Sequence, residues 1–493
     1  MWAVGSRGRD EICSDSAASP DLVPIPPPPS VVSSSVMEET LATVISYLPP
    51  PPVSPTASLS SSSAATSDYE DRISCLPDAL LHNIISRLPT KDAARTTAFS
   101  SRWRSLWAST PLRLDDAGLA PAAVTAALNL HPGPVASARL SSVHLASMGP
   151  DVLDSWFASL AAKNVENLVV VNISWSDECE WRPPPGLLGC AALRSLWLGL
   201  CQFPDTSGLA PTYGNLHEIG IVHGSTQDRE LHAMLPRCPE LESLAIVLTQ
   251  DYPRYIHIWS GSLQSVVVWR SIVREVHLDD APNLERLLLE PIDTASTHIK
   301  IIKAPRLKVL GYFVVGLHQL KIGPTVIKDG MWLKVKPNAM VRTLRTLALK
   351  VQFGVQEQVN LVPLLLKCFP CLETLYIKSS PSESPSNVDV DFWEQVGYTE
   401  CVNSHIKKFV LEDAQGEDTE LAFVKFIMER AQMLEDMRVL VEDGCSRDVV
   451  LSRLSSEGCV SADASVVVER QDMSRAWSFR RASDMSQCDP FDY

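Results

Sequence analysis

Histidine and cysteine side chains are the first candidates for chemistry in this sequence of 493 residues. The histidines closest together are His217, His223 and His232, and no Asp, Glu or Cys accompanies them at the spacing of a metal site. We expect them to face solvent. Cys368 and Cys371 form a C-x-x-C pair. Because zinc needs a second pair of ligands and a redox dithiol needs a thioredoxin-like setting, we expect this pair to pack in a core, and we predict no metal site and no cofactor.

The short motifs of common enzymes are also missing. The sequence contains no G-x-x-x-x-G-K phosphate loop, no G-x-S-x-G elbow, no H-E-x-x-H helix and no kinase signature. We therefore predict a non-catalytic protein, with any catalysis supplied by a partner.

Composition narrows the class of protein further. The formal net charge is −15, which argues against general attraction to nucleic acid because phosphate binding rewards clustered Lys and Arg. The sequence begins without a secretory signal and has no stretch of about 18 apolar residues, so we expect no membrane contact and a location in the nucleus or cytoplasm. The twelve cysteines are expected to be thiols and not a disulfide framework.

The first 68 residues are rich in proline and serine, as in Pro26 to Pro29 and Ser58 to Ser63. Such a segment buries too little apolar surface to offset its ordering entropy, so residues 1–68 are predicted to be a disordered tail. Within it, Met37 to Leu48 has apolar residues at helical spacing and is expected to form a transient or partner-bound helix.

Helical periodicity begins sharply after Asp71. The apolar residues of the first helix recur at intervals of three and four: Leu80, Leu81, Ile84, Ile85 and Leu88. Pro89 ends this helix, Thr90 is expected to cap a second, and a third is expected from Ser101 to Trp107. Three helices this short cannot bury their apolar faces alone and need a partner surface.

These residues resemble the F-box of plant F-box proteins. The matching motifs are Leu76-Pro77, I-x-S-x-L-P from Ile84, K-D-A-x-R-T from Lys91 and S-x-R-W-R-x-L-W from Ser100. The resemblance implies a three-helix domain over residues 71–112 that docks on the Skp-type adaptor, and through it on the cullin, of an SCF ubiquitin ligase. By motif position the adaptor-binding residues would be Leu76, Pro77, Leu80, Ile84, Leu88, Trp103, Leu106 and Trp107. Phe99 stands where a small or branched residue is usual and can fill an apolar slot.

A leucine-containing phrase recurs between residues 135 and 378. It begins at Leu193, Leu216, Leu241, Leu263, Leu284, Leu307, Leu344 and Leu372, and the first five steps are 23, 25, 22, 21 and 23 residues. This spacing is typical of leucine-rich repeats, and the pattern resembles the irregular repeats that follow the F-box in plant proteins. Each phrase predicts a short strand with one face in the core. A target protein would bind the concave face through residues such as Trp197, Trp259 and Trp269.

Residues 365–441 resemble the FBD domain, a C-terminal companion of plant F-box and leucine-rich-repeat proteins, and are expected to close the end of the array. Leu421, Val424, Ile427 and Leu434 form the stripe of its helix. Residues 445–493 are expected to be weakly ordered. They include an R-R-x-S sequence ending at Ser483 that a basophilic kinase would recognise, although such short matches are usually accidental.

Together these features predict an α/β protein: a disordered N-terminal tail, a three-helix F-box, an irregular leucine-rich-repeat solenoid and an FBD end-cap. The resemblance implies the substrate-recognition subunit of an SCF ligase, with an unknown target protein. Two alternatives stay open, a non-degradative F-box scaffold and a small-molecule co-receptor, although no cluster of Arg or Lys favours the latter.

Overall fold

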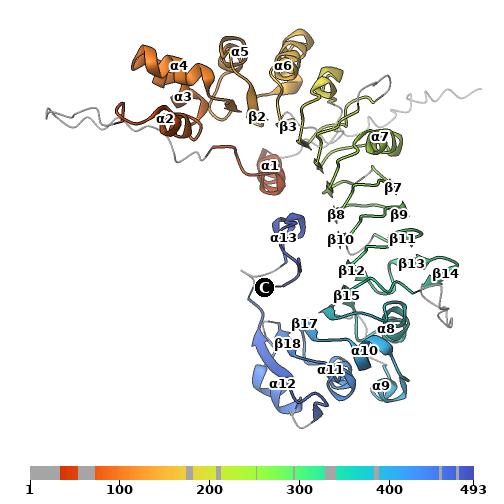
Figure 1. The fold of residues 1–493 in the computed structure, drawn as a ribbon. Coiled ribbons are helices and arrows are strands. Elements are labelled where there is room, and N and C mark those ends of the chain that lie inside the picture. The colour runs from red at the N-terminus through yellow and green to blue at the C-terminus, as the bar shows by residue number, and fades with distance from the viewer. Residues whose placement is uncertain are drawn as a thin grey trace, which may run out of the picture.

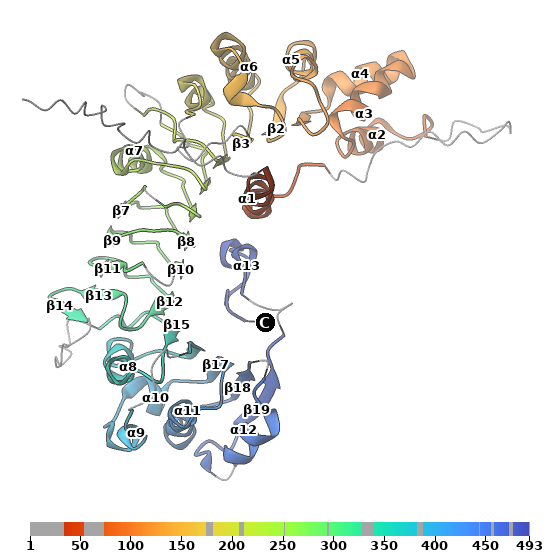
Figure 2. The same cartoon turned by 180° about the vertical axis from the view of Figure 1, so that it is seen from behind.

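The computed structural model describes residues 34–53, 73–173, 181–206, 212–250, 252–292, 295–327, 340–381, 388–442, 444–454, 458–472 and 477–492. These residues form an arc, with a long sheet on its inner side and helices and a smaller sheet on its outer side (Figure 1). Figure 2 shows the arc from behind, with helices from both ends of the chain on the inner side of the long sheet.

Three short helices form a separate group near the N-terminal end of the arc: α2 (Asp78–Ile85), α3 (Thr90–Arg95) and α4 (Ser101–Ser109). Pro77 and Pro89 stand directly before α2 and α3, where a proline leaves no helical hydrogen bond unmade. Thr90 was expected to cap α3 but is its first residue. Its hydroxyl instead donates to the carbonyl of Arg113 at 3.1 Å and accepts from the amide of Asp115 at 3.0 Å.

The inner sheet has 14 strands among the described residues, all paired in parallel, in the order β1-β2-β3-β4-β5-β6-β8-β10-β12-β15-β16-β17-β18-β19. In its first half they are β1 (Leu112–Asp115), β2 (Val135–Leu140), β3 (Asn167–Val171), β4 (Ser195–Gly199), β5 (Glu218–Val222), β6 (Ser243–Val247) and β8 (Ser265–Trp269). In its second half they are β10 (Arg286–Glu290), β12 (Val309–Val314), β15 (Thr346–Val351), β16 (Thr374–Ser379), β17 (Lys408–Ala414), β18 (Asp436–Val441) and β19 (Ser465–Arg470).

The outer side changes along the arc (Figure 1). Near its two ends, helices cover the inner sheet: α5 (Pro121–Leu130), α6 (Pro150–Ala162), α7 (Asp228–Met234), α8 (Gln356–Cys368), α9 (Phe392–Gln395), α10 (Glu400–Ser404) and α11 (Asp418–Arg430). In the middle, the chain between successive inner strands forms strands of an outer sheet in place of helices: β7 (Tyr255–Trp259), β9 (Glu275–Asp280), β11 (His298–Ile301), β13 (Gln319–Ile322) and β14 (Thr325–Ile327).

The repeated leucine phrases form neighbouring inner strands. Leu196, Ile219, Leu244, Val266 and Leu287 are in-register partners along β4, β5, β6, β8 and β10, and all are fully buried. Because side chains alternate across a strand, this row faces the outer layer and builds one continuous core. The predicted leucine-rich-repeat solenoid is confirmed.

The segment that resembles FBD continues the same sheet. β17 pairs with β16, and β18 pairs with β17. Between them α11 covers the outer side, with Leu421, Val424 and Ile427 buried as its predicted stripe requires. The array therefore has one uninterrupted core from its repeats into this C-terminal part.

The prediction of a weakly ordered tail over residues 445–493 is wrong for the residues that the structure describes. β19 pairs with β18 from Ser465 to Arg470 and is the last strand of the sheet. The short helices α12 (Arg447–Arg453) and α13 (Phe479–Ser483) precede and follow it. Phe479 and Phe491 are buried on the inner face, against strands more than a hundred residues earlier, a contact that no local pattern announces.

The predicted disorder of residues 1–68 does not hold for residues 34–53. They contain α1 (Ser34–Tyr47), which confirms the helix expected around Met37 to Leu48. Val44 and Leu48 are buried against the inner sheet, so the helix has a partner within its own chain. The rest of the range 1–68 lies outside the described residues.

Candidate functional site

The helices α2, α3 and α4 hold the predicted adaptor-binding residues in three kinds of surroundings. Trp103 and Leu106 are buried inside the helical group, with Leu81, Ile85 and Ala93. Pro77 and Leu80 are exposed, and Leu76, Ile84, Leu88 and Trp107 are half-buried. The structure therefore brings the eight residues together, but Trp103 and Leu106 face inward and support the surface from below.

Two further apolar residues of the helical group are exposed. Phe99 is 63% exposed and Ile73 is 56% exposed, close to the 51% of Leu80. The ring of Phe99 lies edge-on to that of Trp103, with centroids 5.6 Å apart. The sequence singled out Phe99 only as an unusual residue at its position, and Ile73 was missed because it precedes the recognised motif. We call Ile73, Leu76, Pro77, Leu80 and Phe99 the helical apolar surface.

Polar contacts fix the entry of the chain into this surface. Arg102 pairs with Asp78 at 2.6 Å and donates to the carbonyl of Leu76 at 2.7 Å. The indole N–H of Trp103 donates to the hydroxyl of Ser74 at 3.1 Å, and Ser100 caps α4 by accepting from the Trp103 amide. The turn before α2 is thereby tied to α4.

The helical group is also tied to the arc. His131, at the end of α5, contacts the Trp107 carbonyl through Nε2 at 3.1 Å, and its ring lies edge-on to the Trp107 ring. Burial lowers the pKa of His131, so the ring is neutral near pH 7. Together with the Thr90 bridge to β1, this contact sets the direction in which the helical apolar surface points relative to the repeats.

The inner face of the arc is covered by segments of the chain itself. Trp197 on β4 and Trp269 on β8 were predicted to touch a target, but they are only 2% and 4% exposed. Phe479 of α13 packs on both, with ring centroids 6.1 and 5.7 Å away, and Trp477 packs on Trp269 at 4.6 Å. The third candidate, Trp259, is 61% exposed and belongs to the outer sheet.

The two covering segments meet each other. Tyr47 of α1 contacts Phe479 of α13, with ring centroids 5.4 Å apart. Phe491 packs on Tyr312 and Tyr376 of the inner sheet at 5.3 Å each. We call residues 477–492 the C-terminal cover.

Polar groups anchor the C-terminal cover at its edges. Arg286 on β10 donates to the carbonyl of Asp484 at 2.9 Å. The hydroxyl of Tyr376 donates to the carboxylate of Asp489 at 3.1 Å, and Lys408 pairs with Asp492. Burial raises the pKa of Asp489 above that of an ordinary aspartate.

A groove of about 730 Å³ runs along one rim of the arc, where β12, β15, β16, β17 and β18 end. Its lining carries both signs of charge, with Lys350 and Lys378 beside Asp413 and Glu442. Lys378 and Asp413 form an ion pair at 3.2 Å. We call this feature the rim groove, and the cover does not line it.

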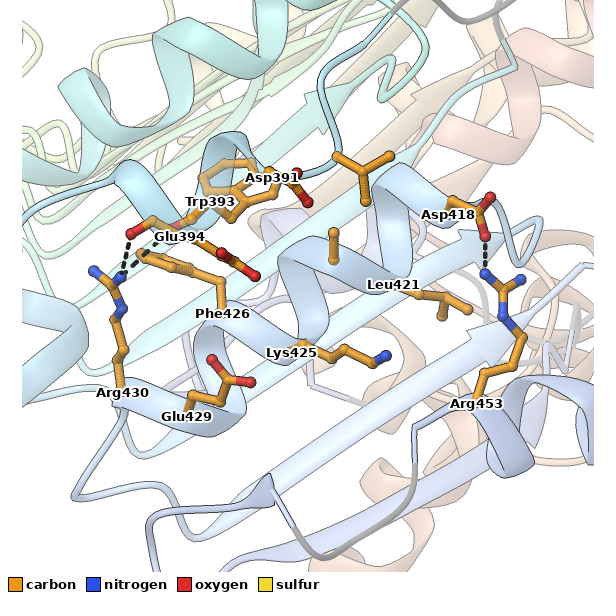
Figure 3. A pocket seen from close by; sticks show the side chains of 12 residues that line it. Asp391, Trp393, Glu394, Asp418, Leu421, Lys425, Phe426, Glu429, Arg430 and Arg453 are labelled. Atoms are coloured by element: carbon orange, nitrogen blue, oxygen red, sulfur yellow. Dashed lines mark hydrogen bonds and ion pairs between the residues drawn. The ribbon is translucent and has the colours of Figure 1, made fainter.

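A smaller hollow of about 290 Å³ lies over α11, between α9 and α12 (Figure 3). Arg430 and Arg453 stand at its opposite ends, the first donating to the backbone of Glu394 and the second pairing with Asp418. Both cations are thus held by the chain itself, and the mixed lining selects no class of ligand.

The cysteine and histidine expectations have different outcomes. Cys368 is fully buried in the core, and burial raises the pKa of its thiol to about 12, which agrees with the packing prediction for Cys368, whereas Cys371 is only half-buried. The prediction that His232 faces solvent is wrong, because its ring packs against that of His257, with ring centroids 5.1 Å apart. Sequence reasoning sought ligands within short motifs and missed that His232, His257 and His277 recur at the spacing of the repeats.

Among the described helices, none has both the length and the apolar character needed to span a bilayer.

Comparison with known families matches most of these parts. The F-box domain model matches residues 73–115, and the FBD model matches residues 395–439. A model described as "FBD-associated F-box protein At5g56370, LRR repeats" matches residues 153–377.

Curated relatives from Arabidopsis thaliana combine the same parts. The chain is 24% identical to F-box/FBD/LRR-repeat protein At1g13570 over 78% of its own length and 95% of that protein. It is 24% identical to F-box/LRR-repeat protein 13 over 82% and 98% of the two lengths. A putative FBD-associated F-box protein, At5g56440, is 30% identical over 48% of this chain and 58% of its own length.

Proposed function

Because the chain belongs to the plant F-box proteins that combine leucine-rich repeats with an FBD domain, we propose that it is the substrate-recognition subunit of an SCF (Skp–cullin–F-box) ubiquitin ligase. The F-box would bind a Skp-type adaptor and, through it, the cullin. The repeats would hold a target protein, and the ligase would modify target lysines brought close to its ubiquitin-carrying enzyme. The chain's own contribution is proximity and orientation, without a bond-making residue.

The observation that carries this proposal is the helical apolar surface. The core of the helical group is already filled by residues such as Leu81 and Trp103, yet Ile73, Leu80 and Phe99 remain more than half exposed. Large apolar side chains left exposed on so small a helical group favour a protein partner, because a partner would remove them from water.

Co-purification of the full chain with a Skp-type adaptor tests the first step. We expect the wild-type chain to bind and the Leu76→Ala, Pro77→Ala double variant to lose binding. Leu130→Ala is a matched control, since Leu130 is 80% exposed at the end of α5, outside the helical apolar surface. No binding by the wild type, or equal loss in the control, would contradict the proposal.

We propose that the target contacts the rim groove of the repeats. The centre of the inner face is occupied by α1 and the C-terminal cover, whereas the rim groove is open and is lined by the exposed Glu442 and the half-buried Gln415. Mixed charge gives specificity and orientation to protein contacts more than raw affinity.

Deletion of the F-box tests the degradative role and identifies the target. We expect one protein to become stable in cells that carry the chain without its F-box. The wild-type complex should ubiquitinate that same protein in a purified assay. If the adaptor binds and no protein is stabilised, the non-degradative scaffold is the better description. With a target in hand, the Gln415→Arg, Glu442→Arg double variant should weaken its binding, and Leu130→Ala should not.

We also propose that the protein acts in the nucleus or cytoplasm, where ubiquitin ligases of this class would meet their adaptor. A fluorescent fusion of the full chain would show a different location if this is wrong.

A further inference from the structure

A cluster of histidines occupies the outer sheet, on the opposite side of the arc from the C-terminal cover. His257 on β7 and His277 on β9 are directly paired in register, and Asp279 follows two residues later on the same face of β9. Val276 and Leu278 alternate with them and are fully buried in the core. The rigid core thus fixes three side chains of metal-binding type side by side on an accessible surface.

Hydrogen bonds already organise the cluster. His257 Nδ1 lies 3.1 Å from Asp279 Oδ2, and the same oxygen accepts from the indole N–H of Trp259 at 3.1 Å. On the other side, His277 Nε2 lies 2.8 Å from Glu275 Oε2. If this carboxylate accepts the Nε2 proton, Nδ1 of His277 carries the lone pair that a metal needs.

A third histidine borders the cluster. His232 on α7 accepts through Nε2 from the backbone amide of His257 at 3.2 Å. Next to it a cavity of about 340 Å³ is lined by His232, Leu235, Pro236, His257 and Trp259. The cluster therefore opens onto a space that water or a further ligand can enter.

The rings of His232 and His277 are affected by burial and by neighbouring positive groups. Burial lowers the pKa of His232 and of His277, and the neighbouring His257 lowers both further. Lys300, paired in register with His277 on β11, also lowers the pKa of His277.

We propose that His257, His277 and Asp279 bind a divalent transition metal ion, best matched by Zn²⁺, in a site that ties two neighbouring repeats together. One ligand atom from each residue lies within 4.8 Å of the others. In a tetrahedral site with zinc bonds of about 2.0–2.2 Å, neighbouring ligand atoms lie about 3.3 Å from one another. Rotation of the three side chains would bring their ligand atoms to this separation. Two imidazoles and one carboxylate leave a coordination position open toward the cavity.

Glu275 has a positioning role in this proposal. Its carboxylate orients His277 without touching the metal, as the outer partners of metal-bound histidines do. The proposed site is separate from the proposed adaptor and target sites, because it lies on the outer sheet and shares no residue with the helical apolar surface or the rim groove.

Zinc titration of the purified full chain tests the proposal. Binding is measured by competition with a chromophoric chelator. We expect the wild type to bind one Zn²⁺ ion, which the His257→Ala, His277→Ala double variant should not bind. Glu275→Gln should weaken this binding by about 10-fold, a loss typical for an outer partner of a ligand. His144→Gln is the matched control, an exposed histidine far along the chain from the cluster, and should bind as the wild type does.

Cobalt substitution separates this site from the cysteines of the chain. Co²⁺ bound by nitrogen and oxygen should give visible d–d bands without a thiolate charge-transfer band. The same zinc stoichiometry and affinity in the double variant, or a thiolate band in its place, would overturn the assignment. Should the double variant fail to fold, an unchanged affinity in Glu275→Gln together with a thiolate spectrum would overturn it equally.

Discussion

Leu80 and Trp103 belong to the same helical motif but have opposite surroundings, and substitutions should separate their roles. Leu80→Ala removes a side chain that is 51% exposed, so the free energy of unfolding should change by no more than about 0.5 kcal/mol. Trp103→Ala empties the core of the helical group and should destabilise it by about 3–5 kcal/mol. Chemical denaturation and adaptor binding, measured on the same samples, check both expectations.

Adaptor binding by these two variants separates a residue of the binding surface from a residue of the core. Leu80→Ala should weaken adaptor binding while the group stays folded, and Trp103→Ala should lose binding because the group unfolds. Equal binding by Leu80→Ala and the wild type would place the adaptor elsewhere on α2 to α4.

Glu420 is a buried carboxylate that holds the start of α11. One of its oxygens accepts from the amides of Gln415, Gly416 and Glu417 at 2.8–3.1 Å, and Ser379 donates to the other. Glu420→Ala leaves these donors without their acceptor and should lower the free energy of unfolding by about 1–3 kcal/mol in urea denaturation. Glu420→Gln keeps an acceptor oxygen and should lose less; an equal loss would mean that charge, and not the hydrogen bonds, matters.

At the scale of elements, β4 and β5 pack closely because a glycine on β5 leaves room for a tryptophan on β4. Gly220 on β5 is the in-register partner of Trp197, and a Cβ at Gly220 would lie 2.2 Å from the indole ring. Gly220→Ala should therefore push Trp197 into Phe479 and destabilise the inner face by about 1–3 kcal/mol. Thermal unfolding measures the loss, and Gly214→Ala, where a Cβ meets nothing within 4 Å, is the control.

Elements defined by local patterns were predictable from the sequence. The helical motif after Leu76 and the strands after Leu193 to Leu372 depend on spacings of three, four or two residues, which a short window reveals. The outer sheet was not predicted, although its strands alternate apolar and polar residues, because they fall between two leucine phrases and only the recurring phrase was taken as a sign of strands. Likewise, the burial of Trp103 depends on three helices at once, so the sequence named it for the adaptor surface without showing that it faces inward.

At the scale of the whole molecule, the two ends of the chain close the concave face that the repeats would otherwise expose. No local signal predicts this, since Tyr312 and Phe491 meet across almost 180 residues of sequence. The contact is mainly apolar, but it leaves some hydrogen-bond donors unpaired. Among the described residues, the indole N–H groups of Trp197, Trp269 and Trp477 are buried without a hydrogen-bond partner. Unsatisfied donors offset part of the gain from burial, so the cover is held less tightly than its aromatic content suggests.

The Phe479→Ala, Phe491→Ala double variant should release the C-terminal cover without unfolding the array. Both rings pack on the inner sheet and not in the main core, so the strands keep their own contacts. Hydrogen exchange should then increase over Phe479–Ser483 and stay low in β6 and β8, with new binding of a hydrophobic dye to the exposed Trp197 and Trp269. General loss of protection across the sheet would mean that the cover is part of the folding unit of the repeats.

Asp489 should make docking of the C-terminal cover sensitive to pH. Burial raises its pKa above the ordinary 3.8, while Tyr376 and Lys408 partly counter the shift and Asp492 adds to it. A carboxyl group with a raised folded pKa stabilises docking fully below its ordinary pKa, and that stabilisation is lost as the pH rises through the raised value. Docking should therefore weaken from about pH 4 upward, seen as a change in Trp477 fluorescence and in exchange over α13.

Asp489→Asn keeps an acceptor for Tyr376 but cannot ionise. At pH 7 this variant should therefore protect α13 better than the wild type does, and its docking should no longer weaken over this range. Weaker protection in the variant would show instead that the attraction between Lys408 and an ionised Asp489 exceeds the penalty of burying the charge.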